Sequence, residues 1–346
     1  MSNLRSRLLL ALAVAAAPLT TGCLESMILN GTIEGTRKGA VAMDTTADFE
    51  IAKSASAAGL AQFEGMHVLA PKNQDAIYLL VKGYASHAFA FVEDDMEIAL
   101  LADDDDMIAY QKERAKSLYT RSIGYGTQWM EAKHPGFDAA AKTGRQEDMV
   151  AYLKNFDDKS DADILFWTGQ AWMSRTNATK EIALIGTVYV GRVMIERVLE
   201  LDPTYEHGTP HVLLGAMASS TGVATLGPDS FKVAAAHFDQ AEQIGGGKDL
   251  LVKVQRAISY ACHMDDPNPG RKGSFDLYVK LLNEVLATPD PAPEYRLLNT
   301  IAKRRARRYL SAKWIDEQFE EECGWDLTAI QKAPLATPAT PPTPSK

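Results

Sequence analysis

Cysteine is scarce in this chain: three residues in a length of 346 cannot form a disulfide scaffold. No CxxC pair or cysteine–histidine spacing typical of zinc occurs, and the seven histidines include no HExxH motif. Acidic residues outnumber basic ones, 45 to 36, which leaves no basic surface large enough to follow a nucleic-acid backbone. We therefore expect no metal, no cofactor, no enzymatic activity and no nucleic-acid partner.

The N-terminus has the three parts of a secretory signal. Two arginines precede an apolar run over residues 8–19, which is too short to span a bilayer core of about 30 Å. Cys23 directly follows Thr20-Thr21-Gly22, the pattern of a lipoprotein cleavage site, and its thiol would carry acyl chains such as palmitate. The sequence thus predicts a signal peptide over residues 1–22 and lipidation of Cys23. The alternative is an ordinary signal peptide with a chance cysteine.

Three further segments follow the signal. Residues 23–46 are interpreted as the lipidated cysteine and a flexible tether of small and polar residues. Residues 47–326 are interpreted as a helical repeat domain, and residues 327–346 as a disordered tail rich in proline, threonine and alanine. Leu24, rather than aspartate, follows the cysteine, and by the sorting habit of bacterial lipoproteins this favours the inner leaflet of the outer membrane. The predicted location is therefore the periplasm, at a membrane.

Apolar residues recur at spacings of three and four through the predicted domain, and β-branched runs are short. This pattern predicts an all-α fold, an α-α superhelix of tetratricopeptide-like helix pairs. In the second helix of each pair we expect small, large and small residues at spacings of four and three. Four segments match: Ala115/Tyr119/Ser122, Gly191/Ile195/Val198, Ala234/Phe238/Ala241 and, more weakly, Tyr278/Leu282/Val285. The predicted first helices cover residues 78–92, 164–175, 211–219 and 250–263, with an additional helix over 146–156.

Three local features allow more than one interpretation. The basic run at residues 303–308 is predicted to be a solvated helix face. Asp103 to Asp106 lack the alternating ligands and central glycine of a calcium loop, so we expect them to start a helix instead. Cys262 and Cys323 could pair in an oxidising compartment, but their spacing gives no measure of their Cα separation. The sequence leaves that disulfide open.

Seven stretches carry a resemblance when they are taken in order: 77–85 (IYLLVKGYA), 88–92 (AFAFV), 114–119 (RAKSLY), 134–137 (HPGF), 165–172 (LFWTGQAW), 194–203 (MIERVLELDP) and 236–238 (AHF). They resemble the T-component lipoproteins that accompany tripartite ATP-independent periplasmic (TRAP) transporters. No single stretch is specific, but their order together with the predicted lipidation site makes the resemblance fairly specific. It implies a tetratricopeptide-like domain that associates with the periplasmic solute-binding protein of such a transporter, without catalysis.

An aromatic set in the first helices is the best candidate for a surface that contacts a ligand or partner. Helical spacing first predicts that most of these rings are core packing. The alternative is a concave groove lined by some of them, since stacked helix pairs usually bind partners on their concave side. The set is Tyr84, Phe89, Phe91, Phe166, Trp167 and Trp172.

These observations together predict a lipid-anchored periplasmic protein that docks a TRAP solute-binding protein and helps to bind or hand over its organic-acid or apolar ligand. The alternative is a general tetratricopeptide scaffold for envelope assembly with no link to transport. A homo-oligomer is compatible with either function, because repeat surfaces often self-associate. The sequence identifies neither the solute nor the face that meets the partner.

Overall fold

A computed structural model of the chain describes residues 24–220, 227–264, 273–290, 292–323 and 325. The predicted signal peptide (1–22), the predicted lipidation site Cys23 and the predicted tail (327–346) lie outside these residues. Within the described part of the chain every regular element is a helix and there is no strand. The predicted all-α fold class is confirmed.

The chain forms an unlabelled N-terminal helix over residues 24–39, followed by α-helices and short 3₁₀ or π segments. The α-helices are α2 (Phe49–Leu69), α3 (Gln74–His87), α4 (Glu93–Leu101), α5 (Asp105–Lys133), α6 (Phe137–Lys142), α7 (Gln146–Leu153), α8 (Ala162–Thr179), α9 (Ile182–Ile185), α10 (Val188–Leu201), α11 (Thr209–Ser220), α13 (Ser230–Gly245), α14 (Leu251–Gln255), α15 (Phe275–Ala287), α16 (Arg296–Tyr309) and α17 (Ala312–Cys323). The 3₁₀ segments are η1 (Ala40–Thr45), η3 (Lys159–Asp161), η4 (Tyr205–Gly208), η5 (Gly227–Asp229) and η7 (Pro293–Tyr295); the π segments are η2 (Ala88–Val92) and η6 (Arg256–Ala261).

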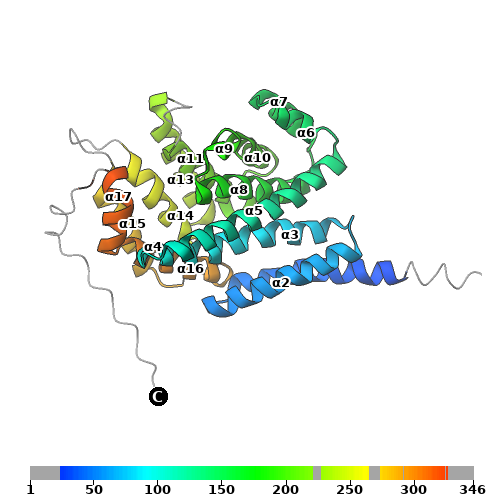
Figure 1. Ribbon diagram of the computed structural model, residues 1–346, viewed down its shortest axis with the longest axis horizontal. Helices are drawn as coiled ribbons and strands as arrows, with labels where there is room; N and C mark the ends of the chain where they lie inside the picture. The colour runs from blue at the N-terminus through cyan, green and yellow to red at the C-terminus, as the bar shows by residue number, and fades with distance from the viewer. Residues whose placement is uncertain (1–23, 221–226, 265–272, 291, 324, 326–346) are drawn as a thin grey trace, which may run out of the picture.

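The helices pack as pairs: α2 runs along the lower edge of the molecule in Figure 1 and contacts α3, while α15 and α17 lie at the left end. The predicted pairs are present: α3 packs on α5, α8 on α10, α11 on α13, and α14 with η6 on α15. The large residue in the middle of each marker is fully buried, as expected for a side chain that fills the gap between two helices; these residues are Tyr119, Ile195, Phe238 and Leu282. The additional helix is present as α7 and ends at Leu153.

Small residues set the distance between α8 and α10. A Cβ atom on Gly191 would lie 2.7 Å from the carbonyl oxygen of Gly169, and a Cβ on Gly169 would lie 2.9 Å from that of Gly191. Contacts this short are excluded by van der Waals repulsion, so only glycine at both positions lets the two backbones come this close. The predicted role of Gly191 as a contact between paired helices is confirmed by this geometry.

The predicted tether is helical where the structure describes it. Residues 24–39 form the N-terminal helix and Ala40–Thr45 continue as η1. Ile33 is fully buried against Met66 and Leu79, and Arg37 binds the carboxylates of Asp75 and Asp163. The interpretation of this segment as a flexible tether was therefore wrong, because its few apolar residues fall on one helix face and pack against α2 and α3.

The basic run at residues 303–308 is also not a solvated face. Arg305 is 2% exposed and Arg308 is 8% exposed, whereas Arg307 is exposed. Arg308 forms ion pairs with Asp94 and Glu97 of α4, although the two residues lie more than 200 positions earlier in the chain. The sequence-based interpretation failed because it considered only the neighbours along α16, and the acidic partners come from α4.

Arg305 also contacts the π segment η2. Its guanidinium donates a hydrogen bond to the carbonyl oxygen of Phe89 at 2.7 Å. Tyr119 donates its hydroxyl hydrogen to Glu93 at the next turn, and Arg305 lies 3.6 Å from the other oxygen of that carboxylate. Burial raises the pKa of Glu93 to about 7, against the lowering effect of Arg305.

A disulfide joins Cys262 to Cys323, with their Cα atoms 5.1 Å apart. Both cysteines are buried beside Trp314 and Trp325. The bond holds the end of α17 against the segment that follows η6, so the question that the sequence left open is answered in favour of the bridge. The start of α5 agrees with the expectation for its aspartates, since the carboxylate of Asp104 accepts the backbone N–H of Met107 at 3.0 Å.

Candidate functional site

The six aromatic residues singled out from the sequence do not form one surface. Tyr84 of α3 donates its hydroxyl hydrogen to Glu64 of α2, 2.6 Å away. Phe91 packs edge-on against Phe49, with ring centroids 5.2 Å apart. Trp172 of α8 lies elsewhere and donates its indole N–H to Thr187 at 3.2 Å.

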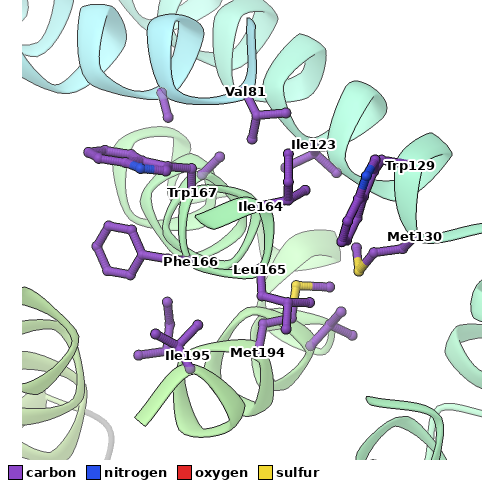
Figure 2. Packing of buried hydrophobic residues seen from close by; sticks show 14 of the residues in the cluster. Val81, Ile123, Trp129, Met130, Ile164, Leu165, Phe166, Trp167, Met194 and Ile195 are labelled. Atoms are coloured by element: carbon purple, nitrogen blue, oxygen red, sulfur yellow. The ribbon is translucent and has the colours of Figure 1, made fainter. Parts of the chain in front are cut away.

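The remaining three rings pack in further places. Phe89 lies under the guanidinium of Arg305, 4.3 Å from its ring centroid. Phe166 and Trp167 are adjacent on α8 and meet edge-to-face at 4.9 Å. Figure 2 shows that consecutive side chains of α8 face different neighbours, with Ile164 toward Ile123 and Leu165 toward Met194. A concave groove lined by some of these rings stays a prediction, and of the six Phe166 and Trp167 contact each other.

Trp167 leads to a group of polar side chains on which five helical segments converge. The ammonium of Lys82, on α3, lies 4.9 Å from the centroid of the Trp167 ring and 3.2 Å from the Glu206 carboxylate of η4. We call the group the Lys82 cluster, and it consists of Arg37, Asp44, Tyr78, Lys82, Asp163, Trp167, Tyr205 and Glu206.

Arg37 closes the other side of the Lys82 cluster. Its guanidinium stacks over the ring of Tyr78 at 4.1 Å and binds Asp163. Tyr205 donates its hydroxyl hydrogen to the second oxygen of Asp163 at 2.9 Å. Two cations therefore lie near the Tyr78 ring, because the Lys82 ammonium also lies 6.0 Å from its centroid. An aromatic body beside a cationic edge is the arrangement that suits an organic acid.

The backbone that carries Glu206 is strained. Glu206 and His207 have φ angles of +42° and +56°, and Gly208 follows at +94°. Non-glycine residues in this left-handed region cost about 1–3 kcal/mol each. Strain of this kind persists only where the surroundings hold it, and here the Glu206 carboxylate is held by Lys82. Glu206 is thus a member of the Lys82 cluster with a strained backbone, and His207 beside it is strained in the same way.

Burial and charge act against each other at Lys82. Burial works to lower the pKa of its ammonium, but the carboxylates of Glu206 and Asp44 and the hydroxyl of Tyr78 outweigh it, so the pKa is raised. Burial raises the pKa of the Asp44 carboxyl, and it raises that of the Tyr205 hydroxyl far above its usual range. Lys82 therefore stays positively charged at physiological pH.

One polar group of the Lys82 cluster has no protein partner. The indole N–H of Trp167 is buried and donates to no acceptor among the described residues. Burying an indole N–H without an acceptor costs free energy, so native proteins seldom leave one unused. Trp167 supplies both the aromatic floor under Lys82 and a spare donor.

Across the described ranges no three histidine, cysteine, aspartate or glutamate side chains are grouped in a way that could hold a metal ion. None of the helices that the structure describes is both long enough and apolar enough to cross a bilayer.

Comparison with known proteins identifies the family. The family model described as "TRAP transporter T-component" matches residues 45–315. The chain belongs to this family. It is also 25% identical over 259 residues to an uncharacterized protein of Treponema pallidum (strain Nichols), a match that covers 71% of this chain and 73% of that protein. As a T-component, the chain is associated with TRAP transport, and the family is not a class of enzymes.

Sequence reasoning found Trp167 but missed the charged residues around it. Lys82 and Asp163 lie within or beside stretches that carry the family resemblance, yet nothing in their spacing relates them to Glu206 or Arg37. Arg37 was missed because its segment was interpreted as a tether. The left-handed backbone at Glu206 has no sequence signal, since glycine follows it only at residue 208.

Proposed function

We propose that this T-component is anchored in a membrane by acyl chains on Cys23, associates in the periplasm with the solute-binding protein of a TRAP transporter, and helps to bind or hand over its organic-acid ligand. Membership in the T-component family is the observation that carries the proposal. It favours a role in transport over a general role in envelope assembly.

The Lys82 cluster supports the part of the proposal that concerns the ligand. Lys82 and Arg37 place two positive charges near the Tyr78 ring, and Trp167 offers an aromatic ring and an indole N–H that has no acceptor among the described residues. The side chain of Lys82 is 31% exposed, so part of it contacts solvent. A carboxylate on the ligand would take the place of Glu206 at Lys82 and release the strained backbone at residues 206–207.

Association is tested by isolating the full-length protein from native membranes and identifying the retained proteins by mass spectrometry. The proposal expects a periplasmic solute-binding protein among them. Recovery of outer-membrane assembly factors without any solute-binding protein would contradict it.

Ligand transfer is tested with a pair of matched variants. Lys82→Met removes the ammonium of the Lys82 cluster, whereas Lys116→Met removes the ammonium of another lysine–glutamate pair, Lys116–Glu181, at 2.6 Å. Each protein is mixed with solute-binding protein that still carries the small molecule with which it was purified, then separated from it and analysed for that molecule. We expect the wild type and Lys116→Met to acquire the molecule and Lys82→Met to lose most of this capacity. Equal acquisition by both variants would contradict a role for Lys82.

A further inference from the structure

Large apolar side chains gather at the end of the molecule where the described chain begins. Leu24, Met27 and Ile28 lie on the first turns of the N-terminal helix, and Val68 and Leu69 end α2. Each of the five is more than half exposed. We call these five residues the apolar tip.

The two parts of the apolar tip lie at the same end of the molecule. The amide of Asn73, in the turn after α2, donates to the side-chain oxygen of Asn30 at 2.7 Å. Leu29 packs with Phe63 and Ala70 on the cluster formed by Ile33 and Met66. Residue 24 lies roughly 9 Å along the helix from residue 30, at 1.5 Å per residue, so the first turns project past the turn between α2 and α3 (Figure 1).

The position of the apolar tip in the chain identifies what covers it. Leu24 is the residue directly after Cys23, so acyl chains on that cysteine would leave the tip only one residue from the lipid. The exposed Lys72 stands in the turn beside Leu69, where its ammonium can reach anionic headgroups, while Glu25 is the acidic residue of the first turn. Apolar side chains with a lysine at their edge are typical of surfaces that enter a lipid–water interface.

We propose that the apolar tip inserts into the interfacial region of the membrane that anchors the chain. The proposal rests on the lipidation of Cys23 proposed above. Insertion at this end would make the long axis of the domain point away from the membrane, because α17 lies at the opposite end of that axis (Figure 1). The lipid anchor alone would leave the orientation free, and the apolar tip fixes it.

The test uses full-length, acylated protein reconstituted into vesicles of phosphatidylethanolamine with a minority of phosphatidylglycerol. A nitroxide spin label is attached at Leu69→Cys in one sample and, as a matched control, at Ile182→Cys in another. Ile182 is an exposed residue of α9, 86% accessible, outside the apolar tip. The accessibility of each label to oxygen and to a water-soluble nickel chelate is measured by electron paramagnetic resonance.

We expect the label at residue 69 to be more accessible to oxygen than to the nickel chelate, and the label at residue 182 to show the reverse. Adding Val68→Asp should shift residue 69 toward the aqueous pattern while the protein still floats with the vesicles. If the protein floats but the label at residue 69 is as accessible to the nickel chelate as the label at residue 182, the insertion of the apolar tip is overturned and the lipid anchor is not. Protein that fails to float would overturn the lipid anchor itself.

Discussion

Replacement of Gly191 by alanine tests the packing that defines the helix pairs. The new methyl group would lie 2.7 Å from the Gly169 carbonyl oxygen, 2.9 Å from Met173 and 3.0 Å from Trp172. Overpacking in a rigid core costs about 1–3 kcal/mol, and the upper part of that range applies here because the nearest atom belongs to the backbone. Alanine regains about 1 kcal/mol through its better helix propensity. We therefore expect Gly191→Ala to lose about 2 kcal/mol of the free energy of unfolding.

The assay is urea unfolding followed by circular dichroism, with Gly186→Ala as the control. Gly186 ends α9 in an ordinary right-handed conformation, and no atom lies within 4 Å of a Cβ built on it. Alanine should fit there and leave the protein equally stable or more stable by up to about 1 kcal/mol. If Gly191→Ala proved as stable as Gly186→Ala, the close contact between α8 and α10 would be refuted.

Three further predictions concern buried charge, pH and the disulfide. Arg308→Met should destabilise the protein by about 3 kcal/mol in urea unfolding, because it strands buried carboxylates on α4, whereas Arg307→Met, at an exposed site, should change stability by less than about 0.5 kcal/mol. Burial, with Arg114 and Lys53 nearby, lowers the pKa of His87 to about 4, below an unfolded value of about 6.5. The contribution of neutral His87 to the free energy of unfolding is complete above pH 6.5 and is lost as the pH falls toward 4. His87→Gln should therefore reduce the loss of stability between pH 7 and pH 5 by about 2 kcal/mol. An unchanged dependence of the free energy of unfolding on pH would contradict this. Reduction of the Cys262–Cys323 disulfide, which closes a loop of 61 residues, should lower the free energy of unfolding by about 4 kcal/mol, measured with and without a reductant.

The helix pairs could be predicted because their information is local. Small and large residues recur every three or four positions, and the pattern at Tyr119, Ile195 and Phe238 marks the faces that are buried. The length of α7 was overestimated by three residues, since the apolar spacing continues past Leu153 where the helix ends. Periodicity identifies the buried face of a helix more reliably than its ends.

Contacts between distant segments could not be predicted in the same way. The sequence shows five basic residues between positions 303 and 308, but the partners of Arg308 lie on α4 and become visible only when the two helices are placed together. The Lys82 cluster has the same character, because Arg37, Lys82 and Glu206 come from three separate parts of the chain. The six aromatic candidates were selected because they are aromatic residues of the predicted first helices. In the folded chain their rings face different neighbours.

Binding between the purified T-component and the TRAP solute-binding protein of its own organism tests the central claim most directly. The two proteins are titrated by calorimetry, each as its folded periplasmic domain. We predict saturable binding with a dissociation constant in the micromolar range or tighter, equivalent to about 8 kcal/mol or more. A titration that shows no heat of binding and no joint elution in gel filtration would contradict the proposed association.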